Sequence, residues 1–324
     1  MARMINWGII GLGKMAEIFA SDLLLAREAN LYAVASRDLK KAAAFCEKFT
    51  CLTSYASYEE LAQDPNIDIV YIATPHTYHF ANSLMCLKHG KAVLCEKPLA
   101  LSLEEEEILY QEAKTRKLFL MEAMWTRFLP TTEKLLQLVN DGAIGQVQFL
   151  RADFGLRAHM NPAHRLFNKQ LGGGALLDIG IYPIYLSLLL FGSPHRINAM
   201  ARMSNTAVDS LCAMLFAYEQ NAIASLESSI EADTPTEAYI YGSEGHIVLH
   251  RRFHQSERLS LHQHGALSEV FELPFRGNGY IHEIEEVNQC LLNGKTESCK
   301  HTLSTSLKLI EIIDRVKEEI GLQY

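Results

Sequence analysis

The sequence has no block of lysine and arginine residues, and its 324 residues carry a formal net charge of −8. Proteins that bind nucleic acid or an anionic membrane surface usually present a basic patch. We therefore expect neither kind of partner, and small-molecule chemistry fits better. With 48% hydrophobic and 21% charged residues, the chain has the composition of an ordinary globular protein.

Cysteine is present in an odd number, seven, and no two cysteines form a C-x-x-C pair. We interpret all seven as reduced thiols, which predicts a cytoplasmic protein. No apolar run approaches the roughly 20 residues that span a bilayer, and the N-terminus leads into a glycine motif instead of a signal peptide. The seven are Cys46, Cys51, Cys86, Cys95, Cys212, Cys290 and Cys299.

Metal-ligand spacing is also lacking, although the chain has 13 histidines. The segments "HTYH" (76–79) and "HQH" (262–264) have no Cys or carboxylate partner at a recognisable spacing, and "HEIEE" (282–286) lacks the second histidine of a zinc-protease motif. The sequence therefore predicts no metal site.

The length predicts two domains, because a single core rarely grows past roughly 250 residues. We expect an α/β protein with an N-terminal Rossmann domain, a doubly wound parallel sheet, over residues 1–123. We expect residues 124–324 to form an α+β domain with a large, mostly antiparallel open sheet.

The first motif is "INWGIIGLGKMAEIFASDLL", which predicts a buried strand, a glycine turn and a helix in that order. In the spacing G-x-G-x-x-A, the first glycine makes a tight turn, the second lets the backbone approach a pyrophosphate, and the alanine lets the helix pack on the strand. The helix N-terminus then faces the phosphates. The predicted contacts are Gly11, Gly13, Lys14, Met15 and Ala16.

The second predicted strand (31–36) ends at Ser36 and is followed by Arg37, where an NAD-binding protein usually has an acidic residue. A carboxylate would repel a 2′-phosphate, whereas a hydroxyl and a guanidinium can bind it. We therefore predict NADP as cofactor in preference to NAD. The alternative is that Arg37 is solvated and Asp38 contacts the ribose.

Two later strands, in "IDIVYIAT" (67–74) and "AVLCE" (92–96), are apolar enough to be buried on both faces. Ligands of open α/β sheets bind outside the carboxyl ends of strands. These ends carry Thr74, Pro75 and His76, and then Glu96 and Lys97, which we predict to line the cofactor site. His76 has the alternative of being a surface loop residue.

The second half reads as half-exposed antiparallel strands at 146–155, 211–218, 222–230 and 236–242. Between the first two lies "GGGALLDIGIYPIYLSLLLFG" (172–192), where Asp178 and Tyr182 stand four residues apart and would share one helix face. Taken alone, both residues could simply be satisfied in the core.

The segments "GIIGLGKMAE", "EKP" and "GGGALLDIGIYP" together resemble the glucose–fructose oxidoreductase/inositol dehydrogenase (Gfo/Idh/MocA) family of NAD(P)-dependent oxidoreductases. Members commonly carry histidine where this chain has Tyr182. That departure, with "MEAMWTRF" (121–128), is most similar to the dihydrodiol dehydrogenase branch, which includes NADP-dependent D-xylose dehydrogenases. The resemblance implies that Lys97 and Tyr182 are the catalytic pair and Asp178 a substrate-binding carboxylate. It also implies that the bond before Pro98 is often cis.

Alcohol oxidation needs a base for the hydroxyl proton while the hydride goes to the nicotinamide. A tyrosine has an ordinary pKa of about 10, so it needs a nearby ammonium to act at neutral pH. Lys97 could supply that charge or be the base itself, and the sequence leaves both possibilities open. Trp125, Arg127 and Phe128 are candidates to bind substrate or to pack a hinge.

The predicted function is oxidation of a secondary alcohol in a cyclic diol or sugar. The alternatives are another polyol substrate, or a regulator that binds the dinucleotide without turnover. The strands at 211–218 and 222–230 carry apolar residues on both faces, although a sheet packed on helices needs only one. We therefore predict a homodimer that pairs these sheets.

Overall fold

The computed structural model describes residues 3–265 and 268–324, which form two compact units. The first unit comprises Met1–Phe128 and Phe275–Leu307, and the second comprises Leu129–Pro274 and Lys308–Tyr324. The predicted division at 123/124 differs from this grouping mainly in Phe275–Leu307, which returns to the first unit. One contact that holds this later segment in the first unit is a hydrogen bond from the indole N–H of Trp7 to the Asn288 side chain at 3.0 Å.

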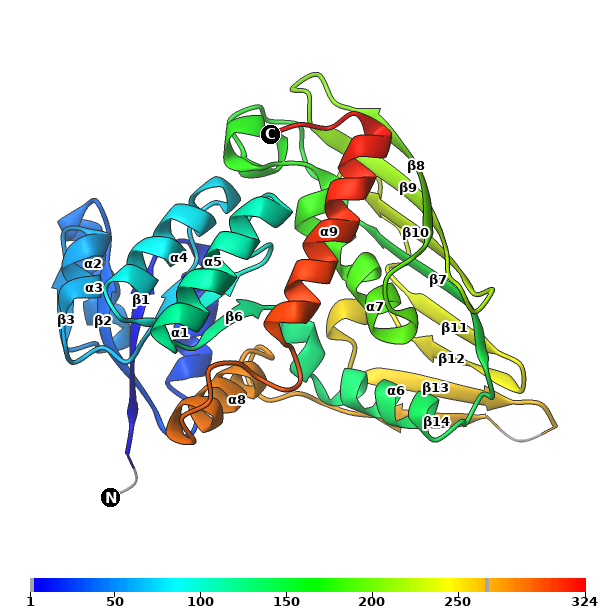
Figure 1. Ribbon diagram of the computed structural model, residues 1–324, viewed down its shortest axis with the longest axis horizontal. Coiled ribbons are helices and arrows are strands. Elements are labelled where there is room, and N and C mark those ends of the chain that lie inside the picture. The colour runs from blue at the N-terminus through cyan, green and yellow to red at the C-terminus, as the bar shows by residue number, and fades with distance from the viewer. Residues whose placement is uncertain (1–2, 266–267) are drawn as a thin grey trace. The chain divides into compact units, whose positions relative to one another are not determined.

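The first unit contains a sheet of six parallel strands in the order β3-β2-β1-β4-β5-β6, as a doubly wound Rossmann domain requires (Figure 1). Its strands are β1 (Ile5–Ile10), β2 (Ala29–Ala35), β3 (Thr53–Tyr55), β4 (Ile69–Ile72), β5 (Ala92–Glu96) and β6 (Leu120–Ala123). Its helices are α1 (Lys14–Leu23), α2 (Leu39–Phe49), α3 (Tyr58–Gln63), α4 (His79–Lys88), α5 (Leu103–Arg116) and α8 (Ile281–Leu292), with the short turns η1 (His76–Tyr78) and η2 (Trp125–Phe128).

Alternating residues of these buried strands pack against different helices. One set, which includes Val70, Ile72 and Cys95, forms a core with Leu87 of α4 and Leu109 of α5. The other set carries large aromatic rings, and the ring of Tyr71 stacks on Phe19 of α1 with centroids 3.5 Å apart. The near-continuous apolar runs in the sequence follow from this burial on both faces.

The second unit contains an eight-stranded sheet in the order β14-β13-β12-β11-β7-β10-β9-β8 (Figure 1). Its strands are β7 (Val147–Gly155), β8 (Arg196–Met203), β9 (Asp209–Ala217), β10 (Ile223–Ser229), β11 (Ala238–Gly242), β12 (Gly245–Leu249), β13 (Arg258–Gln263) and β14 (Glu269–Glu272). The pairs are antiparallel except β7 with β10, which run parallel, so the sheet is mostly antiparallel as predicted.

Helices α6 (Pro130–Asn140) and α7 (Ile181–Phe191) pack on this sheet, and α9 (Leu303–Ile320) ends the chain. Short turns η3 (Arg165–Phe167), η4 (Lys169–Leu171) and η6 (Phe253–Gln255) and a π-helical turn η5 (Leu176–Gly180) complete the unit. The predicted helix through Asp178 and Tyr182 begins with the π-helical turn, which contains Asp178, and continues directly as α7, which contains Tyr182.

The segment Lys169–Phe191 also overturns the expectation that no run approaches the length of a membrane span. It is long and apolar enough to cross a membrane by length and composition alone, yet 83% of its most apolar window is buried inside the protein. Burial of that kind is typical of a core helix.

Two cysteines contradict the prediction that all seven are reduced. Cys46, near the end of α2, and Cys51, before β3, form a disulfide with their Cα atoms 4.8 Å apart. The sequence did not reveal the pair, because the left-handed turn at Thr50 (φ 56°) is what brings the two side chains together. The other five cysteines are free.

Candidate active site

The glycine turn after β1 leaves backbone space for a phosphate. Gly11 has φ +83°, and a Cβ there would lie 2.5 Å from the backbone nitrogen of Thr74, so only glycine fits. A Cβ on Gly13 would meet nothing within 4 Å, which leaves that side of the turn open. Gly13 caps α1 without a side-chain hydrogen bond, so the first backbone N–H groups of α1 remain available. These features fit a dinucleotide pyrophosphate.

The end of β2 presents Arg37 to solvent. Ser36 is largely buried, and its hydroxyl accepts the backbone N–H of Asp38 at 3.1 Å. The Asp38 carboxylate caps α2, since it accepts the backbone N–H of Lys40 at 2.9 Å. This role uses Oδ1 of Asp38, so the alternative contact of its carboxylate with the ribose stays a prediction. Arg37 is exposed and stands next to Asp38.

The loop after β4 is tied to the loop after β5 through His79, the first residue of α4. Its Nε2 lies 2.8 Å from the carbonyl oxygen of Thr74, and its Nδ1 lies 2.7 Å from that of Pro98. Burial lowers the pKa of His79, although both carbonyl contacts favour the protonated ring. Since both ring nitrogens are engaged by the backbone, His79 is not arranged as a metal ligand. His76 is half-buried in η1, with its ring 5.6 Å from that of His79.

Lys97 follows β5 at the carboxyl edge of the sheet. Its side chain is only 8% exposed, and the peptide bond to Pro98 is cis, as the resemblance implied. The neighbouring Glu96 is equally buried, and its carboxylate accepts the Tyr71 hydroxyl at 2.5 Å. Burial and the Glu96 charge raise the pKa of Tyr71 well above its ordinary value, so this phenol remains a donor.

The sequence did not reveal Glu283 of α8 as a member of this region. It is fully buried, and neither carboxylate oxygen has a hydrogen-bond partner among the described residues. Burial raises its pKa well above the ordinary value, and the nearby carboxylates of Glu96 and Asp22 act in the same direction. Burial in these surroundings therefore favours the neutral acid form of Glu283 over the carboxylate. One sequence signal existed, since Glu283 shares the buried face of α8 with Ile284 and Val287.

We expect Glu283→Gln to stabilise the protein increasingly as the pH rises. A carboxyl whose folded pKa is raised contributes stability that is present below its unfolded pKa and lost as pH rises through the folded pKa. As the pH rises above the unfolded pKa of about 4.3, the free energy of unfolding of the variant should gain on that of the wild type by up to about 1.4 kcal/mol per pH unit, until the folded pKa is reached. Urea titrations across this range measure the difference. The exposed Glu107→Gln should show no such trend, and a pH-independent difference for Glu283→Gln would contradict the assignment.

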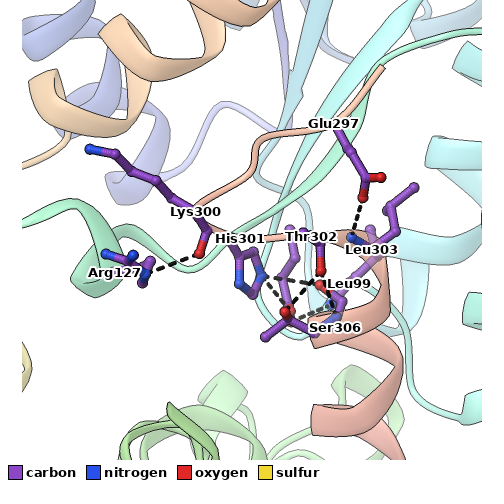
Figure 2. A network of polar contacts seen from close by, with 10 residues as sticks. Leu99, Arg127, Glu297, Lys300, His301, Thr302, Leu303 and Ser306 are labelled. Carbon is purple, nitrogen blue, oxygen red and sulfur yellow. Dashed lines mark hydrogen bonds and ion pairs between the residues drawn. The ribbon is translucent and has the colours of Figure 1, made fainter. Parts of the chain in front are cut away.

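Trp125, Arg127 and Phe128 of η2 are the predicted substrate residues, and the contacts of the first two are with other residues of the first unit. The Trp125 ring stacks on Tyr280 at a centroid distance of 4.8 Å, and both Trp125 and Phe128 are buried. The Arg127 side chain donates from Nε to the carbonyl oxygen of Lys300 at 3.0 Å (Figure 2). Trp125 and Arg127 therefore make packing contacts within the first unit, and substrate binding by η2 stays a prediction. Tyr280 is a partner that the sequence did not indicate.

In the second unit, Asp178 is paired with Arg165, which the sequence also failed to reveal. Nη1 of Arg165 donates to one carboxylate oxygen at 2.7 Å, and Nη2 donates to the other at 3.3 Å. The Asp178 side chain is 9% exposed and that of Arg165 is 52% exposed, so the pair reaches from the interior to the surface. Such a two-point contact fixes the orientation of the carboxylate.

Tyr182 lies in an aromatic group of the second unit. Its ring centroid is 4.9 Å from that of His254 and 5.8 Å from that of Phe154. The preceding glycine run is held by Asp209, whose carboxylate accepts the backbone N–H of Leu176 at 2.7 Å. Burial raises the pKa of Asp209 to about 7. Lys97 belongs to the first unit and Asp178 and Tyr182 to the second, so the predicted site residues are divided between the two.

Comparison with known proteins places this arrangement in a family. Residues 5–124 match the model described as "Oxidoreductase family, NAD-binding Rossmann fold", and residues 132–248 match the "GFO/IDH/MocA C-terminal domain". The chain belongs to the GFO/IDH/MocA family. It is therefore a dehydrogenase that acts on CH–OH groups with a nicotinamide cofactor.

Several members of the GFO/IDH/MocA family are similar over the whole chain. A trans-1,2-dihydrobenzene-1,2-diol dehydrogenase of Xenopus tropicalis is 36% identical, covering 98% of this chain and 99% of the relative. The human protein of the same name is 35% identical over 99% of this chain and 98% of its own. A 3-ketoreductase from Actinomadura kijaniata, crystallised with NADP and TDP-benzene, has a TM-score of 0.90 at 26% identity, with 98% of each chain covered. A levoglucosan dehydrogenase in complex with NADH shares the fold, with a TM-score of 0.89 at 21% identity and 98% of each chain covered.

Proposed function

We propose that the protein oxidises a secondary alcohol of a cyclic diol or sugar, of the trans-dihydrodiol or D-xylose type, with NADP as cofactor. The observation that carries this proposal is the full-length similarity to enzymes named trans-1,2-dihydrobenzene-1,2-diol dehydrogenase. The buried Lys97 at the carboxyl edge of the parallel sheet supports it, because that edge is where such folds bind their ligands.

In the proposed reaction, bound NADP supplies the acceptor for the hydride from the carbinol carbon. The N–H groups of Lys14 and Met15 and the backbone at Gly13 would hold its pyrophosphate, and Ser36 and Arg37 would hold its 2′-phosphate. Thr74, Pro75, His76 and Glu96 would line its nicotinamide end. Lys97 and Tyr182 act on the hydroxyl proton of the substrate. An ammonium lowers the pKa of a neighbouring phenol, so the two groups can share this task.

Asp178 orients the substrate in this proposal. A carboxylate held from one side by Arg165 keeps acceptor capacity for a hydroxyl, since its two oxygens offer about four lone-pair sites. Trp125 and Phe128 would supply the apolar wall for a flat ring, and Arg127 would fix the segment that carries them through Lys300.

The substrate class is tested by rates of NADP reduction with benzene trans-dihydrodiol, D-xylose, D-glucose and inositol. We expect kcat/KM for the dihydrodiol or D-xylose to exceed that for the other two by at least about tenfold, a selectivity within reach of a shaped pocket. Turnover confined to inositol would favour another polyol as substrate. Cofactor binding without turnover of any alcohol would favour the regulator.

The cofactor proposal predicts weaker NADP binding by Arg37→Asp. Loss of a hydrogen bond to a charged phosphate costs roughly 1.5–3 kcal/mol, which corresponds to an increase in Kd of about 10- to 150-fold. Fluorescence titration with NADP and with NAD measures the preference, and the exposed Lys40→Asp is the charge-matched control. Equal affinities of the wild type for both cofactors would contradict the proposal.

We further propose a homodimer that pairs the outer faces of the eight-stranded sheets. Apolar side chains on this face are exposed, among them Met200 at 79%, Leu215 at 48% and Ile223 at 43%. Exposed apolar patches of this kind usually mark an interface. Light scattering at micromolar concentration should give twice the mass of one chain, and Leu215→Glu should give a monomer. A monomeric wild type would overturn the proposal.

The cytoplasm is the proposed location, because five of the seven cysteines are free.

A further inference from the structure

The two residues that follow Lys97 are hydrogen-bonded through their backbone to two buried side chains. The carbonyl oxygen of Pro98 is held by His79 at 2.7 Å. The backbone N–H of Leu99 donates to Oε1 of Glu122, at the end of β6, at 3.1 Å. Glu122 is only 1% exposed, and Leu99 equally so, so water does not compete for this bond.

His301 holds the second carboxylate oxygen of Glu122. Its Nε2 lies 3.3 Å from Oε2 of Glu122, and both side chains are 0–1% exposed. The same nitrogen lies 3.1 Å from the Ser306 hydroxyl, and Figure 2 shows the imidazole directed at Ser306, with Leu99 beside the pair. A buried carboxylate is costly unless its oxygens are satisfied, and a proton on Nε2 of His301 gives each of them a donor.

The segment that carries His301 is itself fixed on both sides (Figure 2). Arg127 donates to the carbonyl oxygen of Lys300, and the Glu297 carboxylate accepts the backbone N–H of Leu303 at 2.9 Å. The Thr302 hydroxyl accepts the backbone N–H of Thr305 at 3.2 Å. Hydrogen bonds on both sides therefore fix the backbone at His301, which lies 179 residues along the chain from Glu122.

We propose that Glu122 and His301 are positioning residues for Lys97. Glu122 fixes the backbone two residues after Lys97, and His301 fixes the direction of the Glu122 carboxylate. The proposed function needs the Lys97 ammonium at a defined distance from the substrate hydroxyl, because proton transfer falls steeply when reacting groups are misplaced. The inference rests on that function and adds two residues that touch neither substrate nor cofactor.

The test compares Glu122→Ala, which removes the acceptor for the Leu99 N–H, with Glu122→Gln, which keeps it. In Glu122→Ala we expect kcat to fall at least about tenfold, the Kd for NADP to stay within about twofold, and the pH midpoint of kcat/KM to move by about half a unit or more. Glu122→Gln should recover most of kcat. His301→Gln, whose amide can still donate to Glu122, should resemble Glu122→Gln. Glu112→Gln of α5, which loses only its pair with Arg116, is the control.

A double-mutant cycle with Lys97→Met separates positioning from general support of the fold. If Glu122 acts through Lys97, Glu122→Ala should cause no further loss in the Lys97→Met background. A folded Glu122→Ala with wild-type kcat, or an equal loss in both backgrounds, would overturn the inference. Wild-type activity in Lys97→Met would instead overturn the proposed function, so the two failures are distinguishable.

Discussion

Lys97→Met should lower turnover at least about a hundredfold while NADP binding stays nearly intact. The expected size of the loss is that of a missing group for proton transfer, which typically contributes 10²- to 10⁴-fold. The glycine turn at Gly11 and Gly13 is untouched by the change, so the cofactor should still bind. Methionine keeps most of the length of the side chain and fits a position that is 8% exposed.

Steady-state kinetics and cofactor titration on the same preparation measure the two effects of Lys97→Met separately. The matched control is Lys88→Met, because Lys88 is exposed at the end of α4. The control should keep wild-type kcat. A wild-type rate in Lys97→Met would remove the central residue of the proposed mechanism.

Tyr182→Phe is the second change for which we expect a large effect, a fall in kcat of roughly a hundredfold. Phenylalanine preserves the ring contacts with His254 and Phe154 and deletes only the hydroxyl. Stability should therefore change little, and the loss should appear in kcat with an altered pH profile. Tyr241→Phe, on the exposed outer face of the sheet, is the control.

The outcome of Tyr182→Phe also decides which group takes the proton. If activity survives with an unaltered pH profile, Lys97 alone is the base. If both Tyr182→Phe and Lys97→Met are inactive, the pair acts as a unit, and combining the two changes should cost little more than either alone.

The sequence predicted those parts of the fold that depend on neighbouring residues, namely turns that need glycine and strands or helices with a regular apolar pattern. The strand, turn and helix from Ile5 to Leu23 could be predicted because only glycine tolerates the backbone at Gly11. The parallel sheet of the first unit could be predicted from apolar runs separated by helices. The parallel pairing of β7 with β10 could not be predicted, because a pairing between distant strands leaves no local pattern.

The sequence could propose site residues only where they belong to motifs. Lys97, Asp178 and Tyr182 stand in such motifs, whereas their partners come from distant segments. Arg165 lies in an unremarkable turn 13 residues before Asp178. His301 contacts Glu122, which lies 179 residues away in the chain. Glu283 becomes part of the first unit only because Phe275–Leu307 packs there, far along the chain from the other residues of that unit. Tertiary packing alone assigns these residues a role.

Isotope transfer tests the central claim most directly. A trans-dihydrodiol or D-xylose carrying deuterium on the carbinol carbon is incubated with the enzyme and NADP, and the reduced cofactor is examined by mass spectrometry. Direct hydride transfer predicts one deuterium in the reduced nicotinamide for the wild type and almost no labelled product for Lys97→Met. Reduced cofactor without deuterium, or no reduction by either substrate, would contradict the account.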